Sequence, residues 1–252
     1  MIYSVGIGPG DPDMLPHKTV LLLKEADVIS GFDTVLNLAE KHFNPNAILI
    51  SMGYKNQSEK LEQVGKYSRE GKKCVVCFMG DVNFSGYEYL ERINSSCQEP
   101  NPIIIPGISS AQIAASKTLT AFETSVFLTF HKRGDISKDK EFLVSALKLG
   151  KAAIVIPLPW DFMPAEISRH LIEQGIPPKT EVKIFEHLTW PEEKAYSRTL
   201  ENCIEKFSDV SIMVISSINS PFDFFKFVNL GIFAELISAQ AVCKKRLNIA
   251  FI

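Results

Sequence analysis

The first half of the chain alternates between short apolar segments and longer helix-like segments, and this alternation constrains the fold most. Stretches rich in valine, isoleucine and leucine are separated by stretches in which apolar residues recur with helical spacing. Such alternation predicts a largely parallel sheet covered by helices, because each parallel crossover needs a helix-length connection. The predicted strands are 2–6, 27–30, 47–51, 74–79 and 103–106, and the predicted helices are 18–26, 34–42, 57–70, 85–95 and 110–119.

The second half predicts another α/β lobe. Strands are expected at 125–130, 152–157, 181–186 and 210–216, with helices at 138–149, 164–174 and 200–207. Because the link at 119–124 is short, we expect two lobes that meet directly, 1–120 and 121–252, with a ligand cleft between them. From residue 219 onward several phenylalanines crowd together before the basic run 244–246, which predicts a packing helix followed by a solvated tail.

Composition narrows the class of protein. The formal net charge of −2 gives no general attraction to nucleic acid or to anionic membranes, so recognition of a negative ligand must come from local basic clusters. No uninterrupted apolar stretch approaches the roughly 20 residues that span a bilayer, and a cytoplasmic protein is expected. Cys74 and Cys77 lie three apart in a predicted strand and so face opposite sides, and the histidines show no i, i+4 pair. We therefore expect no metal site.

A turn of alternating glycines and prolines follows the first strand. In Gly6-Ile7-Gly8-Pro9-Gly10-Asp11-Pro12 the glycines allow sharp bends and close approach to a ligand, while the prolines stiffen the loop. A stiff loop at the end of a first strand indicates a ligand site, and an ordinary strand-to-helix turn is the alternative. Asp11 is a candidate proton acceptor or a turn-forming side chain.

Three further segments follow predicted strands. Met79-Gly80-Asp81 leads to Phe84, and Pro106-Gly107-Ile108-Ser109-Ser110 opens a helix that its hydroxyls can cap unless they face a ligand. His131-Lys132-Arg133 follows the first strand of the second lobe. Each segment taken alone is also compatible with a simple turn.

Together the four segments resemble the tetrapyrrole methylase family. The opening loop matches the first signature of that family, Gly80-Asp81 the second, and the run from Pro106 to Ser110 the third. The resemblance covers roughly residues 1–217. Within the family the chain resembles the branch that methylates carbon 5 of a precorrin or cobalt-precorrin, on the residues 106–112, 131–133, 190–193, 199–201 and 207–209.

The resemblance implies an S-adenosylmethionine-dependent C-methyltransferase of cobalamin biosynthesis. It implies two α/β lobes, with a mostly parallel sheet in the first and a mixed sheet in the second, and a homodimer. The cofactor would bind in the trough between the lobes. The implied cofactor contacts are Gly8, Pro9, Gly80, Asp81, Phe84, Ser109 and Ser110 in the first three signatures, and Leu158, His187 and Ser211 in the second lobe.

The charge of the implied substrate predicts which residues bind it. A precorrin carries many carboxylates, so Lys132 and Arg133 are the predicted substrate-binding residues, and His131 is a candidate for moving a proton. A solvent-facing strand cap is the alternative for these three residues. The expected partner is a small tetrapyrrole, with neither nucleic acid nor membrane. The resemblance also implies that a separate enzyme, which methylates and decarboxylates at carbon 15, would act next.

Departures from the family pattern, among them the run Asn83-Phe84-Ser85-Gly86 in place of a glycine-aromatic pattern, leave other functions open. Val82 replaces the usual proline after Gly-Asp, and Pro16 stands where threonine is common. A related enzyme could methylate another precorrin position, a ribosomal RNA ribose or a modified histidine of elongation factor 2. A dehydrogenase using Asp33 is disfavoured because the opening loop lacks G-x-G-x-x-G spacing. A non-catalytic ligand-binding protein is the remaining class.

Overall fold

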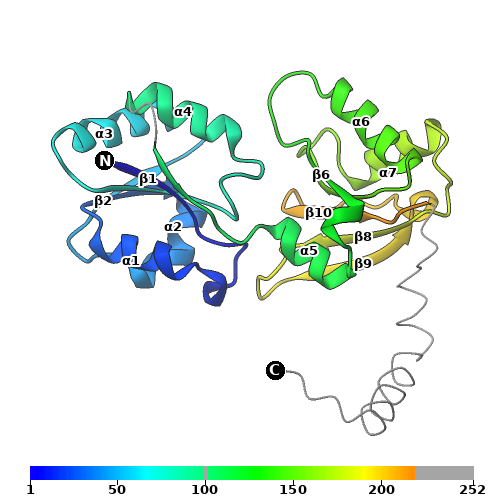
Figure 1. Ribbon diagram of the computed structural model, residues 1–252, viewed down its shortest axis with the longest axis horizontal. Helices are drawn as coiled ribbons and strands as arrows, with labels where there is room; N and C mark the ends of the chain where they lie inside the picture. The colour runs from blue at the N-terminus through cyan, green and yellow to red at the C-terminus, as the bar shows by residue number, and fades with distance from the viewer. Residues whose placement is uncertain (99–101, 219–252) are drawn as a thin grey trace, which may run out of the picture. The chain divides into compact units, whose positions relative to one another are not determined.

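The computed structural model describes residues 1–98 and 102–218, which contain two five-stranded sheets (Figure 1). The predicted tail after residue 218 lies outside the described residues. Met1–Ile218 form one compact unit. No helix in the described ranges is long and apolar enough to cross a membrane.

The first sheet is entirely parallel, in the order β3-β2-β4-β1-β5. This confirms the prediction for the first half of the chain. Its strands are β1 (Ile2–Gly6), β2 (Val28–Phe32), β3 (Ile48–Met52), β4 (Cys74–Phe78) and β5 (Ile103–Ile105).

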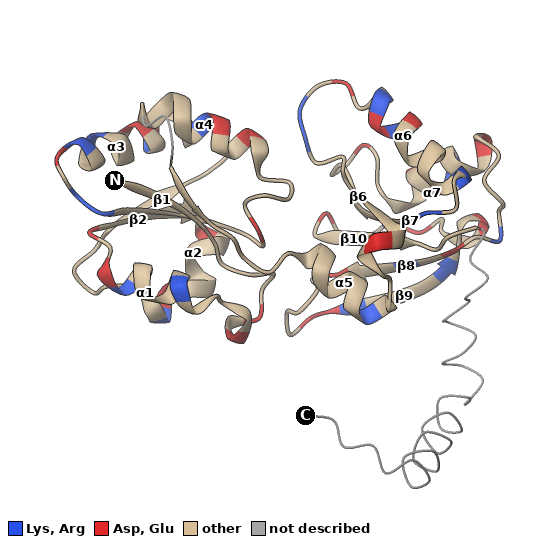
Figure 2. Ribbon diagram, viewed as in Figure 1, with Lys and Arg blue, Asp and Glu red and all other residues tan. Residues whose placement is uncertain are grey.

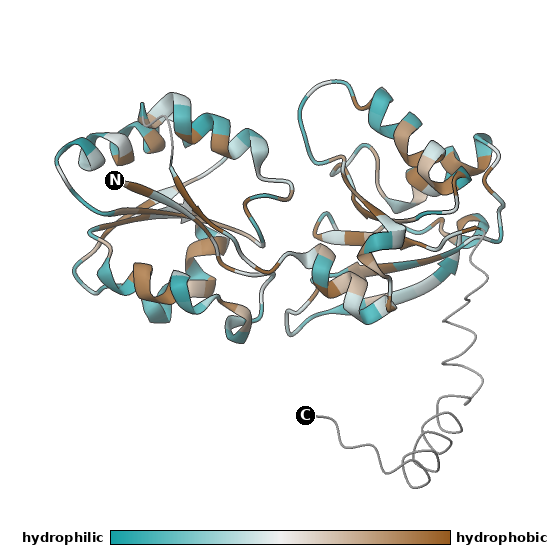
Figure 3. Cartoon of the chain, viewed as in Figure 1, coloured by the Kyte–Doolittle hydropathy of each residue, from teal (hydrophilic) through white to brown (hydrophobic). Residues whose placement is uncertain are grey.

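Helices cover both faces of this sheet. Helices α3 (Gln57–Arg69) and α4 (Tyr87–Cys97) pack on one face, and α1 (His17–Glu25) and α2 (Asp33–Ala39) pack on the other (Figure 1). Cys74 lies in the first of these cores and Cys77 in the second, so the two thiols do face opposite sides of β4. Figure 3 shows the resulting pattern, with apolar strands between helices whose outer faces are hydrophilic.

The second sheet is mixed, in the order β6-β7-β10-β8-β9, as expected for the second lobe. Only β6 and β7 are parallel, and the other neighbours are antiparallel. The strands are β6 (Ser125–Thr129), β7 (Ala152–Ile156), β8 (Glu181–Glu186), β9 (Lys194–Thr199) and β10 (Ser211–Ile215). Helices α6 (Ser137–Lys148) and α7 (Pro164–Glu173) pack on one face.

Helix α5 (Ser110–Thr118) packs with the second sheet, although the sequence analysis placed it in the first lobe. The small side chains of Ala111, Ala114 and Ala115 form its buried face and contact a cluster from β7, β8 and β10. Their small side chains let the helix lie close to the sheet. Nothing in the sequence indicated this packing, because α5 precedes the first strand of the second sheet and follows the last strand of the first. The division at residue 120 stays a prediction, and the packing of α5 favours a boundary ahead of that helix.

Two local predictions in the second half were wrong. Lys194–Thr199 forms β9, which was not predicted, and pairs with β8 along six residues. The predicted helix 200–207 is only one short 3₁₀ turn, Leu200–Asn202. The exposed edge strand carries charged and polar residues on both faces, so it lacks the apolar alternation by which a strand is recognised. Other 3₁₀ turns occur at Pro12–Met14, Glu40–His42 and Phe122–Thr124.

Candidate functional site

Three loops meet at the carboxyl edge of the first sheet, after β1, β4 and β5. A Cβ atom on Gly6 would lie 2.5 Å from the carbonyl oxygen of Gly80 and 2.6 Å from the amide nitrogen of Gly107. A Cβ atom on Gly107 would lie 2.1 Å from the same Gly80 oxygen. These are backbone atoms, so no side-chain movement can relieve the clash, and only glycine fits. The glycines thus join three strand ends at the edge where open α/β sheets bind ligands.

The opening loop is also hydrogen-bonded to the loop after β4. Gly8 N donates to Gly80 O at 3.3 Å, and Gly80 N donates to Gly8 O at 2.8 Å. Both glycines have positive φ, 84° and 70°, which other residues seldom adopt. Pro9 follows and is buried. The structure therefore brings together Gly8, Pro9 and Gly80, three of the predicted cofactor-binding residues.

Asp81 holds the turn that follows Gly80. Its Oδ1 accepts hydrogen bonds from Asn83 N and Asn83 Nδ2, both at 3.0 Å, and its carbonyl oxygen accepts from Phe84 N at 3.1 Å. The Phe84 ring meets the Phe127 ring of β6 edge to face, with centroids 6.1 Å apart. Val82, the departure from the family pattern, is fully buried in this turn.

Asp11 has the turn-forming role. Its Oδ1 accepts from Asp13 N at 2.9 Å and caps the 3₁₀ turn Pro12–Met14. One carboxylate oxygen is therefore committed to the backbone, and a catalytic role for Asp11 stays a prediction without support from its contacts.

A loop of the second lobe clasps the opening loop. Between β8 and β9, Trp190 Nε1 donates to Pro9 O at 2.9 Å, and Thr189 Oγ1 accepts from Asp11 N at 3.0 Å. Gly10 makes room for the indole, because a Cβ atom there would lie 2.0 Å from Trp190 Cδ1 and Nε1. We call these contacts the Trp190 clasp.

The clasp loop is itself braced by Glu193. Its Oε2 accepts from Thr189 N at 2.7 Å, and its Oε1 pairs with Lys117 Nζ of α5, also at 2.7 Å. Burial acts to raise the pKa of Glu193, but the hydrogen bonds from Lys117 and Thr189 prevail and lower it. Thr189 has a φ of 72°, a strained value for a β-branched residue. Strain held in place by such contacts is typical of ligand-binding loops.

Ser109 caps α5 rather than standing free. Its Oγ accepts from Ala111 N at 3.1 Å, and its backbone N donates to Gln112 Oε1 at 2.7 Å, which completes a capping box. Ser110 is the first residue of the helix and is half-buried. Capping, one of the two uses expected for these hydroxyls, is thus the use that Ser109 has; a cofactor contact stays a prediction for both serines.

The basic segment after β6 lies beside the first lobe. Arg133 N donates to Glu88 Oε1 at 2.6 Å, and Lys132 Nζ pairs with Asp139 Oδ2 at 2.6 Å. The surrounding protein desolvates His131 and lowers its pKa below the usual 6.5, although Glu88 acts in the opposite direction. A pKa below 6.5 favours the neutral form of His131 at pH 7, and this form can accept a proton.

A hollow of about 510 Å³ lies where this segment faces the loop after β4. Its lining includes Phe84, His131 and Lys132, which the sequence predicted as cofactor, catalytic and substrate residues. A hydrogen bond of 2.8 Å between Ser85 Oγ and Thr129 Oγ1 joins the two lobes at its wall. Residues from both lobes thus converge on one hollow, as the predicted cleft requires.

The three predicted contacts of the second lobe are not all brought together. His187 Nε2 lies 3.1 Å from Ser208 Oγ, and its backbone N donates to Val210 O, so His187 sits beside Ser211. His187 Nδ1 and Ser211 Oγ are buried and have no hydrogen-bond partner within the described ranges. Leu158 instead packs on the α6 and α7 side of the sheet.

Sequence reasoning missed the residues that connect the lobes. Trp190 was noted only as part of a resemblance, and Thr189, Ser85 and Glu88 were not singled out. The one local signal was Gly10, a third glycine in the opening loop whose missing side chain accommodates the indole. Contacts of this kind join residues far apart in the chain, and a single sequence does not show them.

Comparison with known proteins gives consistent matches. The profile of Tetrapyrrole (Corrin/Porphyrin) Methylases matches residues 1–204. The chain is 30% identical over 203 residues to the probable cobalt-precorrin-7 C(5)-methyltransferase of Methanocaldococcus jannaschii, covering 80% of this chain and 90% of that protein.

Solved structures share the fold. The match to a cobalt precorrin-4 methyltransferase has a TM-score of 0.70 at 22% identity and covers 85% of this chain and 94% of the other. The match to the precorrin-6Y methylase of Archaeoglobus fulgidus has a TM-score of 0.65 at 22% identity and covers 87% and 99%. Because the profile matches residues 1–204 and the relative from Methanocaldococcus jannaschii is 30% identical, this chain belongs to the tetrapyrrole (corrin/porphyrin) methylase family.

Proposed function

We propose that this protein is an S-adenosylmethionine-dependent methyltransferase that methylates carbon 5 of a precorrin or cobalt-precorrin in cobalamin biosynthesis. The observation that carries the proposal is the junction of Gly6, Gly80 and Gly107 beside a hollow lined from both lobes. Family membership and the C(5)-methyltransferase relative support the choice of reaction.

The residues around the junction suit S-adenosylmethionine. Gly8, Pro9, Gly80 and Asp81 would hold it at the edge of the first sheet, where a Cβ atom on Gly80 would meet no atom closer than 3.8 Å, so the missing side chain leaves room for a ligand. His187 Nδ1 and Ser211 Oγ are buried and have no hydrogen-bond partner among residues 1–98 and 102–218, and a polar cofactor can provide one. When bound, S-adenosylmethionine supplies the methyl group that is transferred to the ring carbon.

Positioning is the main task of the protein in such a transfer. The Trp190 clasp fixes the opening loop, and the Ser85–Thr129 bond fixes the lobes across the hollow. Holding two reactants in line can contribute about 7 kcal/mol or more to lowering the barrier. His131 lines the same hollow, and its lowered pKa supports a role in which it would take up a proton at an imidazole nitrogen.

The basic residues beside the hollow favour an anionic substrate, although the net charge of the whole chain is close to zero. Figure 2 shows acidic and basic residues interspersed over the helices and loops of both lobes, so charge selectivity must arise locally. Lys132 is already paired with Asp139, whereas Arg133 uses only its backbone N in the contact with Glu88. Arg133 is therefore the more available cation for a substrate carboxylate.

Calorimetry tests the cofactor half of the proposal. We expect S-adenosylhomocysteine to bind and NAD not to bind, because the opening loop lacks dinucleotide spacing. Binding of NAD alone, or of neither ligand, would refute a methyltransferase.

Mass spectrometry tests the substrate half. The protein is incubated with S-adenosylmethionine and a panel of precorrins and cobalt-precorrins that lack different ring methyl groups. We expect a gain of one methyl group on the compound that lacks the carbon 5 methyl. A gain on another intermediate would retain the reaction class and overturn the assignment to carbon 5.

The proposal includes a cytoplasmic homodimer and a separate enzyme that acts at carbon 15. Sedimentation equilibrium is expected to give about twice the chain mass of 28.1 kDa. A monomer that is fully active would contradict the dimer while leaving the chemistry intact.

A further inference from the structure

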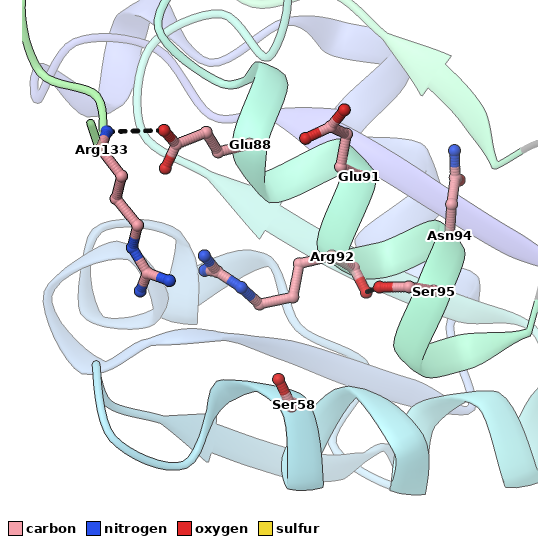
Figure 4. A pocket seen from close by; sticks show the side chains of 7 residues that line it. All are labelled: Ser58, Glu88, Glu91, Arg92, Asn94, Ser95 and Arg133. Carbon is pink, nitrogen blue, oxygen red and sulfur yellow. Dashed lines mark hydrogen bonds between the residues drawn. The ribbon is translucent and has the colours of Figure 1, made fainter. Parts of the chain in front are cut away.

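A second hollow, of about 850 Å³, lies between α3, α4 and the segment after β6. Two arginines from different lobes line it, Arg92 of α4 and Arg133 of the segment after β6. Figure 4 shows their guanidinium groups extending toward each other, with Ser58 below them. Such an arrangement places two positive charges at one location.

The acidic side chains of the hollow are engaged elsewhere. Glu88 Oε1 accepts from the backbone N of Arg133 at 2.6 Å, as the dashed line in Figure 4 marks. Glu91 interacts with the Tyr87 hydroxyl, and this hydrogen bond raises the pKa of Tyr87. The carboxylates therefore do not neutralise the two guanidinium groups through a direct side-chain contact.

The described residues outside the hollow supply no acidic partner for either arginine. Arg92 donates from Nη1 to the neutral side-chain oxygen of Gln57. Across residues 1–98 and 102–218, neither Arg92 nor Arg133 forms an ion pair. Two like charges that face each other are unfavourable, and an anion between them would turn the repulsion into attraction.

We propose that Arg92 and Arg133 form a clamp that binds one peripheral carboxylate of the tetrapyrrole substrate from both lobes. Guanidinium groups are suited to this task, because each presents paired donors that match the two oxygens of a carboxylate. The clamp names a substrate contact of the proposed methyltransferase and rests on that proposed function.

The position of the clamp fits a substrate that extends from the site. The hollow shares Glu88 and Glu91 with the neighbouring hollow that holds Phe84 and His131, so the two adjoin. A ring that occupies the first hollow and carries carboxylates around its rim would present one of them to the second. The clamp thereby links substrate binding to contact between the lobes.

The test compares Arg92→Gln, Arg133→Gln and the double variant with the unchanged protein. Arg169→Gln is the matched control, because Arg169 is exposed on α7 and lines neither hollow. Uroporphyrin I, an octacarboxylate tetrapyrrole, is titrated by fluorescence, and S-adenosylhomocysteine is titrated by calorimetry. Arg92→Lys, which retains the charge but not the fork, guards against a folding defect from loss of the Gln57 contact.

We expect each single variant to bind uroporphyrin about tenfold more weakly, the effect of losing a charge-assisted hydrogen bond. The double variant should lose less than the product of the two single effects, because both arginines hold one carboxylate. Arg92→Lys should fall between Arg92→Gln and the unchanged protein. The affinity for S-adenosylhomocysteine should stay within about twofold in all of these variants, since the proposed cofactor contacts lie in the loops after β1 and β4 and not in the clamp.

Equal uroporphyrin binding by the unchanged protein and both single variants would overturn the clamp and leave the proposed function standing. If those variants instead lose binding of inorganic phosphate, the pair is a site for free anions, and the proposal also fails. An unchanged protein that binds S-adenosylhomocysteine but no tetrapyrrole would overturn the clamp together with the proposed substrate class. Failure to bind S-adenosylhomocysteine would refute the methyltransferase itself.

Discussion

The close fit of Gly10 against Trp190 makes the Trp190 clasp open to a direct test. In Gly10→Ala the new Cβ atom would lie 2.0 Å from the indole, whereas ordinary contacts begin at 3.4 Å. The indole must therefore retreat by about 1.4 Å, the difference between these distances. Its hydrogen bond to Pro9 O, now 2.9 Å long, cannot survive such a movement.

The cost can be worked out from three contributions. Overpacking costs about 1 kcal/mol here, the low end of its range, because the indole is half-buried and can move outward. The lost hydrogen bond adds about 1 kcal/mol. An alanine at the Gly10 φ of 150° adds roughly another 1 kcal/mol. We expect Gly10→Ala to lower the free energy of unfolding by about 3 kcal/mol.

The same substitution should cost less when the indole is absent. In a Trp190→Leu background neither the clash nor the hydrogen bond remains, so only the backbone term of about 1 kcal/mol is left. Urea unfolding of the four proteins gives the coupling, expected to be about 2 kcal/mol. If Gly10→Ala costs the same in both backgrounds, the proposed fit between Gly10 and Trp190 is refuted.

Fluorescence offers an independent measurement of the same contact. The chain has two tryptophans, and Trp160 is 83% exposed, so Trp160→Leu leaves Trp190 as the reporter at little cost in stability. In that background Gly10→Ala should shift the emission to longer wavelength as the indole enters water. It should also weaken S-adenosylhomocysteine binding, because the opening loop loses its support.

Three further outcomes are expected. Ser109→Ala removes the hydrogen-bond acceptor for Ala111 N and should lower the free energy of unfolding, measured by urea titration, by about 1 kcal/mol. Ser109→Thr keeps an acceptor and should lower it much less, and equal losses in the two variants would contradict the capping role. Asp81→Asn keeps a hydrogen-bond acceptor for Asn83 but removes the negative charge, so the urea midpoint of unfolding should be unchanged while S-adenosylhomocysteine binds about tenfold more weakly. An unaltered affinity would show that Asp81 is not part of the cofactor site. The folded pKa of His131 lies below its unfolded value of 6.5, so the stability that His131 contributes is fully present above pH 6.5 and declines as the pH falls toward the folded pKa. His131→Gln should therefore reduce the loss of stability on acidification. An NMR titration midpoint at or above 6.5 would contradict this reasoning.

Much of the first lobe could be predicted because its signals are local. Strands such as Cys74–Phe78 are buried on both faces and appear as continuous apolar runs, and the helices between them carry helical periodicity. The opposite facing of Cys74 and Cys77 follows from the two-residue repeat of a strand. The polar edge strand β9 offered neither signal, and its place was decided by backbone pairing with β8.

The candidate site divides in the same way. The glycine loops and the basic segment are recognisable from short stretches of sequence, because glycine permits and proline imposes specific backbone geometries, and consecutive basic residues indicate affinity for anions. The residues left open whether Asp11 forms a turn or accepts a proton, and whether the Ser109 hydroxyl caps a helix or faces a ligand. The structure shows the turn and the cap, through the hydrogen bonds from Asp13 N and Ala111 N, while the ligand roles stay predictions.

By itself, the sequence determined two α/β lobes, the loops that edge the first sheet and the resemblance to a family of methylases. Only the tertiary structure decided which residues bring the lobes together. Trp190 Nε1 and Pro9 O are 181 residues apart in the chain, and Arg92 and Arg133 come from different lobes. Backbone propensity and periodicity act over a few neighbouring residues, whereas these contacts depend on how two different sheets of one compact unit meet.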